Sequence, residues 1–284
     1  MNLPKISIIT VVYNAAKTIE ETVLSVIQQA YSNIEYVIID GKSTDGTVAI
    51  LEQYQSHFGY FISESDKGLY DAMNKGMKQC SGDFCLFLNA GDVLYESTTI
   101  EQIIVEIDDL YKVYFSTAVL TDRKSMYRLI PPEKVEIEEW LKDRLPNHQT
   151  MLFPRAFYTQ NEYDLSYRIS ADDDFKLRAL RQYSSKFIPI WSVIFEMGGL
   201  SSSYASFKVV QQRINELYRL YDFYYPDQKM VIHKFALKSY FIFLMSRFWS
   251  EDKLIRRFNK FDVIPKGEEE RFQPFTNKKA AQNQ

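Results

Sequence analysis

Short, uninterrupted apolar runs alternate with segments of helical periodicity through the first hundred residues, and this alternation constrains the fold more than any other feature. The run at 6–12 is β-branched, uninterrupted and too short for a helix, which is typical of a strand buried on both faces of a sheet. The runs lie at residues 6–12, 36–39, 60–63 and 84–88, with helical segments at 16–30, 47–58 and 67–80. Because strands joined by crossover helices run parallel, the sequence predicts an α/β, Rossmann-like fold with a mostly parallel sheet and helices on both faces.

The second half of the chain is less regular but still divides into segments. Further strands are expected at 113–121, 126–130, 151–153 and 186–190, and further helices at 133–145 and 171–183. From residue 206 to residue 261 the pattern is helical, broken at Pro226. We therefore expect one domain over 1–205, a helical C-terminal region over 206–262 and a polar, disordered tail over 263–284.

Composition narrows the class of protein. A net charge of -3 gives no electrostatic case for nucleic-acid binding, and no apolar stretch approaches the ~20 residues that span a bilayer. The two cysteines, Cys80 and Cys85, lack the partners of a zinc site and fit reduced thiols in or beside a core. Since no secretory leader is seen, we expect a cytoplasmic protein, either free or peripheral on the inner face of the plasma membrane.

Polar residues follow each of the four predicted parallel strands. They lie at 13–14, 40–46, 64–68 and 89–92. In an open parallel sheet, ligands bind beyond the carboxyl ends of the strands, so these segments are expected to meet in one acidic pocket. Carboxylate and amide oxygens suit Mg²⁺ or Mn²⁺, and the pocket is therefore expected to hold a nucleotide and a divalent cation.

Four motifs carry a resemblance to a known family. SIITVVYN, IIDGKSTDGT, SDKGLYDAMNKG and LNAGD, in this order and at this spacing, resemble the successive signatures of glycosyltransferase family 2, of the bacterial surface-polysaccharide type. The resemblance is close over residues 5–95 and scattered up to about residue 205. It implies that residues 1–205 form a GT-A nucleotide-sugar transferase domain, with a UDP-sugar as donor and Mg²⁺ or Mn²⁺ as cofactor.

The resemblance also implies roles for single residues. Val11 and Tyr13 would line the base pocket, and Asp40 would accept a hydrogen bond from the base. The other positions that would contact the donor are Asp66, Lys67, Asp71 and Asn74.

The metal position departs from the family pattern. Asp92 would lie at the metal, but where many members read Asp-x-Asp-Asp this chain reads Asn89-Ala90-Gly91-Asp92. Two of three carboxylates are missing, which leaves open whether Asn89 is a metal ligand.

A second group of acids begins a predicted helix. Ser170 and Asp173 fit a capping box, and acids in a first turn suit the helix dipole, so Asp173 and Asp174 are equally explained by a helix cap and by a functional role. Asp172 matches the family's catalytic base, and a transferase needs one carboxylate to accept the proton of the acceptor hydroxyl.

Two further segments resemble family positions near the acceptor and the diphosphate. They contain His148, Gln149 and Gly199. A lone histidine is more often structural than functional, and Gly198-Gly199 is equally explained by a turn.

The expected activity is inverting transfer of a sugar from a nucleoside diphosphate sugar to a hydroxyl of a glycan or lipid-linked oligosaccharide. The alternative is a catalytically impaired nucleotide-sugar-binding protein, because Gly91 replaces a metal-binding acid. A dinucleotide oxidoreductase is disfavoured because no GxGxxG follows the first strand. A sugar nucleotidyltransferase is disfavoured because the Gly-rich, basic loop it needs there is absent.

The segment 229–260 is basic and aromatic. It holds eight Lys or Arg against two acids, with aromatic residues interleaved. This pattern predicts an interfacial membrane contact, and it is equally explained by a helical cap that packs on the enzyme core. The same helices would also serve a homodimer.

Overall fold

Ten strands form a single mixed sheet in the computed structural model, which describes residues 3–121, 126–129, 145–196, 206–249 and 261–263. The strands are β1 Ile6–Val12, β2 Ile34–Asp40, β3 Tyr60–Ser63, β4 Phe84–Phe87, β5 Val93–Leu94, β6 Val113–Thr121, β7 Met126–Leu129, β8 Met151–Pro154, β9 Ser185–Glu196 and β10 Phe261–Val263. The helices are α1 Ile19–Ile27, α2 Thr47–Glu52, α3 Leu69–Met77, α4 Thr99–Ile104, α6 Arg155–Tyr158, α7 Ala171–Gln182, α8 Phe207–Tyr224 and α9 Lys229–Met245, with short 3-10 turns at Gln55–His57, His148–Thr150 and Pro226–Gln228.

The strand order confirms the predicted α/β fold class and defines where the parallel part ends. The order is β10-β7-β6-β8-β4-β1-β2-β3, and the four neighbours β4, β1, β2 and β3 run parallel. Beyond β4 the sheet turns antiparallel at β8, β6, β7 and β10, while β9 runs parallel to β6 through a bulge. Only four residues join β6 to β7, too few for a crossover, so that pair has to be antiparallel.

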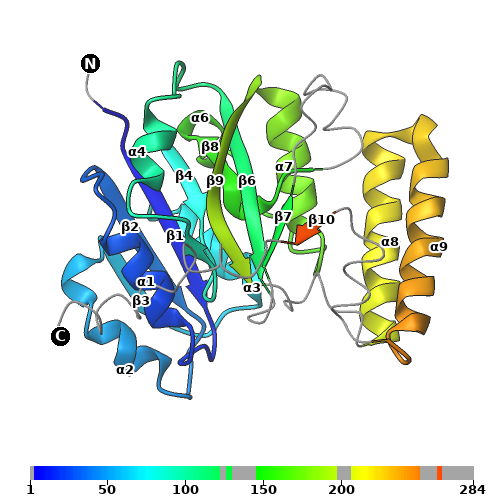
Figure 1. The fold of residues 1–284 in the computed structure, drawn as a ribbon, viewed down its shortest axis with the longest axis horizontal. Helices are drawn as coiled ribbons and strands as arrows, with labels where there is room; N and C mark the ends of the chain where they lie inside the picture. The colour runs from blue at the N-terminus through cyan, green and yellow to red at the C-terminus, as the bar shows by residue number, and fades with distance from the viewer. Residues whose placement is uncertain (1–2, 122–125, 130–144, 197–205, 250–260, 264–284) are drawn as a thin grey trace.

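The sheet is covered by helices on both faces (Figure 1). Alternate residues of β1 point to opposite faces, so Ile6 and Ile8 pack in one core and Ile9 and Val11 in the other. The first core is closed by α1, α2 and α4, and the second by α3, α7 and α8. This two-sided burial explains why β1, β2 and β4 appear in the sequence as uninterrupted apolar runs.

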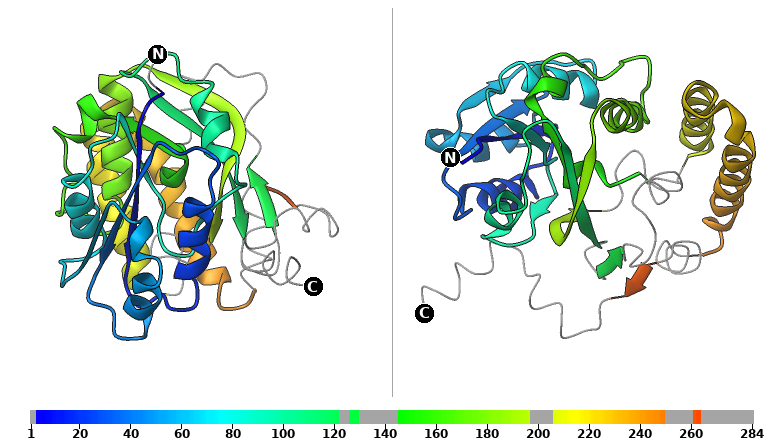
Figure 2. Two further views of the ribbon diagram at one scale, coloured as in Figure 1. Left: turned by 90° about the vertical axis from the view of Figure 1, so that its left-hand side faces the viewer. Right: turned by 90° about the horizontal axis from the view of Figure 1, so that it is seen from above.

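The C-terminal helices α8 and α9 form a hairpin at one end of the molecule (Figures 1 and 2). Leu217 and Leu220 of α8 join the core under α7, so α8 is docked on the domain. The prediction of helix up to residue 261 is wrong at its end, because Phe261–Val263 pairs with the open edge of β7. The predicted helix over 133–145, apart from Leu145, and the predicted disordered tail over 263–284, apart from Val263, lie outside the described residues, and the proposed domain division stays a prediction. Val263 belongs to β10.

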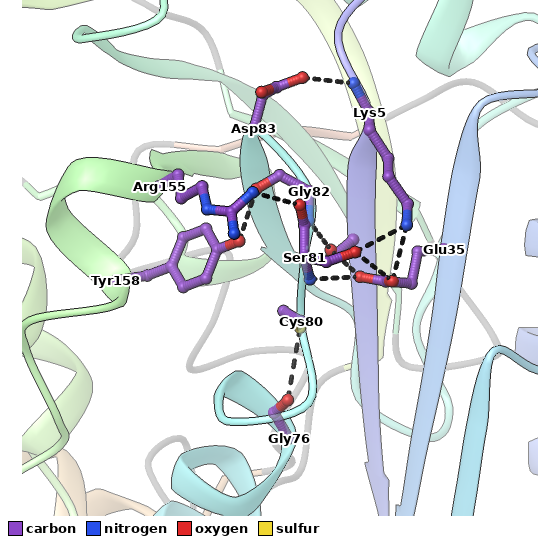
Figure 3. Close-up of polar contacts among 10 residues, drawn as sticks. Lys5, Glu35, Gly76, Cys80, Ser81, Gly82, Asp83, Arg155 and Tyr158 are labelled. Carbon is purple, nitrogen blue, oxygen red and sulfur yellow. Dashed lines mark hydrogen bonds and ion pairs between the residues drawn. The ribbon is translucent and has the colours of Figure 1, made fainter.

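A polar network closes the amino-terminal edge of the parallel strands (Figure 3). Glu35 of β2 accepts hydrogen bonds from Lys5 Nζ at 2.8 Å and from the Ser81 backbone at 2.7 Å. Arg155 in turn donates to the Ser81 carbonyl at 2.8 Å. The turn between α3 and β4 is thereby fixed to β1 and β2.

Both cysteines are unlinked thiols, as expected. Burial raises the pKa of the Cys80 thiol to about 12, and its Sγ donates to the carbonyl of Gly76 at 3.3 Å (Figure 3). Burial also raises the pKa of Cys85, so neither thiol ionises at neutral pH.

Candidate active site at the carboxyl edge of the sheet

Asp40 ends β2 at the carboxyl edge, where its side chain is fully buried. The carboxylate accepts hydrogen bonds from the Ser43 backbone at 2.9 Å, from the Ser43 hydroxyl and from the Ser63 hydroxyl at 2.6 Å. A carboxylate has about four acceptor positions, so three of them are already used. The structure shows Asp40 fixing the turn after β2 against β3, and its contact with a base stays a prediction.

Tyr13 and Asp66 approach the same backbone atom, the Cα of Gly41. A Cβ atom added there would lie 2.6 Å from Asp66 Oδ2 and 3.3 Å from Tyr13 Cδ2. The Tyr13 ring is 66% exposed, whereas the neighbouring Val11 is buried in the core. The ends of β1, β2 and β3 therefore meet as predicted, and they present an exposed aromatic ring beside a carboxylate.

The turn that leads into α3 is organised by two aspartates. Asp66 Oδ1 accepts from the Gly68 backbone at 2.8 Å, and Asp71 Oδ2 accepts from the Lys67 backbone at 2.9 Å. These bonds satisfy the backbone N–H groups of Lys67 and Gly68 at the start of α3, which have no acceptor within the helix. The side chain of Lys67 is exposed at this turn and thus accessible to an anionic ligand.

Asn74 lies one turn further along α3 and is buried. Its Nδ2 donates to the Tyr163 carbonyl at 3.1 Å, and its Oδ1 accepts from the Tyr163 backbone at 2.7 Å. The amide is thus engaged at both ends by one residue. The structure shows Asn74 holding Tyr163, and its predicted contact with the donor is not tested.

Asp92 follows β4 and is 3% exposed. Burial raises the pKa of its carboxyl to about 8, although hydrogen bonds from the Glu196 backbone (3.0 Å) and the Gln149 side chain oppose this shift. The nearby charge of Glu196 adds to the rise in the pKa. A buried carboxylate of this kind is stabilised in its ionised form by a cation.

Two side chains near Asp92, those of Asn89 and Glu196, show whether the residues present fit a divalent cation. Asn89 Oδ1 is buried and, among the described residues, receives no hydrogen bond. The Glu196 carboxylate lies against Gly91, where a Cβ atom would come within 2.8 Å of Glu196 Oε2. The described part of the chain contains no group of three or more His, Cys, Asp or Glu side chains arranged for a metal. Since Mg²⁺ is commonly held by one or two carboxylates plus substrate phosphates, the oxygens at this corner fit a cation that binds together with a diphosphate.

Asp172 lies at the start of α7 with its side chain 25% exposed. Its Oδ1 accepts from the Tyr70 hydroxyl at 3.0 Å, and its Oδ2 lies 3.4 Å from Lys176 Nζ. Lys176 is buried and also pairs with Asp173 at 2.8 Å. Asp174 is engaged differently, because it binds Arg178 at 2.8 Å and the Tyr224 hydroxyl at 2.8 Å.

His148 and Gln149 lie between Asp92 and the acids of α7. The His148 ring is buried, stacks on Phe87 with centroids 4.8 Å apart, and shares a 2.6 Å hydrogen bond with the Tyr163 hydroxyl. Burial and the nearby Lys176 lower the pKa of His148 to about 3, so the ring is neutral. These surroundings give His148 a structural place, while the side chain of Gln149 reaches Asp92.

The predicted residues therefore fall into three adjoining groups. Tyr13 and Asp66 mark the end of β1 to β3, Asp92 marks the end of β4, and Asp172 begins α7. The contact of Tyr70 with Asp172 joins α3 to α7. Gly199 lies outside the described residues, and the assignment of each residue to donor, metal or acceptor stays a prediction.

Sequence reasoning missed four residues of this region, Tyr70, Lys176, Glu196 and Glu216. Lys176 had a visible signal, since it follows Asp172 by four residues on one helix. The other three act across elements distant in sequence, so no local pattern indicates them.

Comparison with known proteins identifies the family of this chain. The model of glycosyl transferase family 2 matches residues 7–174. An uncharacterized glycosyltransferase of Mycobacterium tuberculosis (strain CDC 1551 / Oshkosh), MT1564, is 30% identical over 253 residues, which cover 87% of this chain and 95% of the relative.

Two solved structures share the fold at low identity. The Staphylococcus aureus protein TarS 1-349 in complex with UDP-GlcNAc aligns with a TM-score of 0.63 at 17% identity, over 88% of this chain and 77% of that chain. The mannosyltransferase PcManGT from Pyrobaculum calidifontis, in complex with GDP-Man and Mn²⁺, aligns with a TM-score of 0.59 at 16% identity over the same shares. With the family model matching more than half of its length, this chain belongs to glycosyl transferase family 2 and is a glycosyltransferase of the GT-A fold.

Proposed function

We propose that the enzyme transfers a sugar, with inversion at the anomeric carbon, from a nucleoside diphosphate sugar to a hydroxyl of a glycan or lipid-linked oligosaccharide. The observation that carries this proposal is the Asp172 carboxylate, partly exposed and held by Tyr70 and Lys176. A UDP-sugar is the proposed donor, supported by the UDP-GlcNAc complex of TarS, and a GDP-sugar is the alternative, supported by the GDP-Man complex of PcManGT. The product would serve cell-surface polysaccharide biosynthesis.

The proposed step is a single displacement. Asp172 accepts the proton of the acceptor hydroxyl while the hydroxyl oxygen bonds to C1 of the sugar and the bond from C1 to the diphosphate breaks. The nucleoside diphosphate leaves as an anion, and the exposed ammonium of Lys67 lies at the turn where it would pair with that charge. No covalent sugar–enzyme intermediate is needed.

Asp92 and Asn89, together with Glu196, would hold a Mg²⁺ or Mn²⁺ ion at this site. A bound cation would supply Lewis-acid neutralisation of the leaving diphosphate. Glu196 lies beside Gly91 and would replace the acid that many family members have at position 91. Calorimetric titration with Mn²⁺ and UDP tests this directly, and we expect weaker Mn²⁺ binding in Glu196→Gln and Asp92→Asn. Unchanged Mn²⁺ binding in both variants would contradict the assignment.

The donor is identified by binding. We expect one nucleotide sugar from a panel of UDP- and GDP-sugars to raise the thermal unfolding midpoint in the presence of Mn²⁺, because a ligand that binds only the native state stabilises it. If no nucleotide sugar raises the midpoint, the proposed donor class is wrong.

The second candidate function is nucleotide-sugar binding without catalysis, and Gly91 is the observation that favours it. The two functions differ in turnover, because a binding protein holds the donor intact. Release of free nucleoside diphosphate from the identified donor supports the enzyme, and binding with no release over hours supports the second function.

The outer face of α9 supports a proposed contact with a membrane surface. Four large apolar side chains of α9, and that of Phe248 in the turn after it, are exposed and follow one another at spacings of three, four and seven residues: Met230, Leu237, Phe241, Leu244 and Phe248. The exposed cations Lys234 and Lys238 lie on the same helix, and residues 229–249 contain no acid. Apolar side chains flanked by cations complement an anionic lipid surface, which would bring the enzyme to a lipid-linked acceptor. Within the described residues, no helix is both long and apolar enough to cross a bilayer.

Vesicle sedimentation tests this outer face of α9. The full chain should bind vesicles that contain anionic phosphatidylglycerol more tightly than purely zwitterionic vesicles, and Leu237→Glu with Leu244→Glu should abolish that preference. Val105→Glu is the matched control, since Val105 is 79% exposed in another part of the molecule. Equal binding of all variants would contradict the proposal, as would a homodimer in solution that the two α9 substitutions dissociate.

A further inference from the structure

Glu216 lies on α8, where its side chain faces the domain instead of solvent and the residue is 6% exposed. Its carboxylate accepts hydrogen bonds from three successive backbone groups, those of Arg168, Ile169 and Ser170, each at 2.9 Å. Gln212 donates to the same carboxylate at 3.0 Å. Three consecutive N–H groups that converge on one anion form a backbone nest.

The three residues that Glu216 binds are the last ones before α7. Ser170 is the cap residue of that helix, and its carbonyl accepts the bond from the Asp174 backbone at 3.2 Å. Asp172 is the second residue of α7. The position of its carboxylate therefore depends on where the segment 168–170 places the helix start.

The same segment is also fixed from the opposite side. The Tyr70 hydroxyl lies 2.7 Å from the carbonyl of Ile169 and 3.0 Å from Asp172 Oδ1. Glu216 binds the N–H group of Ile169 while Tyr70 binds its C=O group. Helix α3 of the domain and helix α8 of the hairpin thus hold one peptide segment between them.

We propose that Glu216 is a positioning residue, through which the C-terminal hairpin holds the proposed catalytic base in place. This inference rests on the proposed role of Asp172. It gives α8 a role in positioning the proposed base, and this role is separate from the membrane contact proposed for α9. A misplacement of about 1 Å at a reacting group can reduce the rate about 100-fold, so one carboxylate beneath the helix start is enough to affect turnover.

The docking of α8 does not depend on Glu216 alone. Leu217 and Leu220 are buried in the core, the Tyr224 hydroxyl donates to Asp174 at 2.8 Å, and Arg181 donates to the Tyr224 carbonyl. A substitution at Glu216 should therefore loosen the segment 168–170 and leave the helices in contact.

Glu216→Gln is the principal variant, because the glutamine side chain has nearly the same size but replaces one acceptor oxygen with a donor. In either orientation of the glutamine amide, at least one of the three N–H groups of 168–170 would face an NH₂ group and lose its acceptor. We expect hydrogen–deuterium exchange of the amides of 168–170 to accelerate at least about tenfold. We expect kcat to fall about 10- to 100-fold, while KM for the donor changes less than about threefold.

Asp227→Asn is the matched control, since it removes the same charge from an exposed site between α8 and α9. It should leave both exchange and kcat unchanged. Glu216→Asp retains the carboxylate on a shorter stem and should recover part of the kcat that Glu216→Gln loses. If the glutamine variant does not fold, the aspartate variant still compares amide exchange with kcat.

Wild-type exchange at 168–170 or wild-type kcat in folded Glu216→Gln would overturn the proposal. Failure of the proposed function has a different signature. In that case Asp172→Asn would retain activity, whereas the exchange measurement would still report whether Glu216 holds the segment.

Discussion

The hydroxyl of Tyr70 lies 3.0 Å from Oδ1 of Asp172, although 102 residues of sequence separate them. Burial, and then the charge of Asp172, raise the pKa of Tyr70 far above its ordinary value, so the hydroxyl remains a donor. The contact ties α3, which carries residues predicted to contact the donor, to α7, which carries the proposed base near its start.

Removing this hydroxyl should lower both the stability of the fold and turnover. Tyr70→Phe retains the ring in the core and leaves Asp172 and the Ile169 carbonyl without this donor, at a cost of about 1–3 kcal/mol in the free energy of unfolding. We expect kcat to fall about tenfold with an unchanged Kd for the donor, as measured by steady-state kinetics and calorimetry. A kcat equal to that of the wild type would show that the contact does not orient Asp172.

Lys176 should be a large contributor to stability. Its buried ammonium lies between Asp172 and Asp173, so Lys176→Met leaves two carboxylates without their cation. These carboxylates are about a quarter exposed, which moderates the loss to about 2–4 kcal/mol in urea denaturation. The control is Lys78→Met, which breaks the exposed pair with Glu162 and should cost less than about 1 kcal/mol. Equal losses in the two variants would contradict the importance of burial.

The parallel half of the sheet was predictable because its determinants are local. The strands at 6–12 and 60–63 have the predicted bounds. The first is an uninterrupted, largely β-branched run that is buried along its whole length. β2 extends past the predicted run to Asp40, because this aspartate pairs with β1 and β3 in the ladder despite its polarity. From its polarity, Asp40 was expected in the loop after the strand.

Alanine substitutions at Gly91 and Gly46 distinguish the cost of backbone strain from a specific effect on the cation site. Both have φ of 100°. Alanine at either position should therefore cost about 1–2 kcal/mol of stability. At Gly46 nothing lies within 4 Å of the added Cβ, whereas at Gly91 the Cβ would push Glu196 Oε2 aside. We expect Gly91→Ala to weaken Mn²⁺ binding about 3- to 10-fold and Gly46→Ala to leave it unchanged. Identical Mn²⁺ affinities would mean that Glu196 is not part of the site.

Glu35 stabilises the folded protein at neutral pH, and this contribution should be lost in acid. Burial alone would raise the pKa of its carboxyl, but hydrogen bonds from Lys5, Ser7 and Ser81 outweigh this effect and lower it to about 2. The folded state therefore binds fewer protons than the unfolded state between about pH 4.5 and pH 2, so stability is lost as the pH falls through this window. Urea denaturation of Glu35→Gln should show a smaller loss over this window than the wild type. Glu162→Gln, at an exposed pair, should retain the wild-type profile.

The site was less predictable than the fold, because its residues are held by long-range contacts. The motifs correctly brought Tyr13 and Asp66 together at one edge, since parallel strands share that edge. They gave no sign of Glu216, whose partners lie 46 to 48 residues away and meet it only once α8 has docked. The motifs also gave no sign that the Asn74 amide binds the Tyr163 backbone, and the predicted contact of Asn74 with the donor stays a prediction.

Asp172→Asn offers the most direct test of the central claim, with turnover and donor binding measured on the same preparation. The substitution retains the size of the side chain and removes its capacity to accept a proton at neutral pH. We predict that kcat falls about 100- to 10,000-fold while the Kd for the nucleotide sugar stays within about threefold of the wild-type value. Near-normal turnover by this variant would contradict the account, because another group would then have to accept the proton of the acceptor hydroxyl.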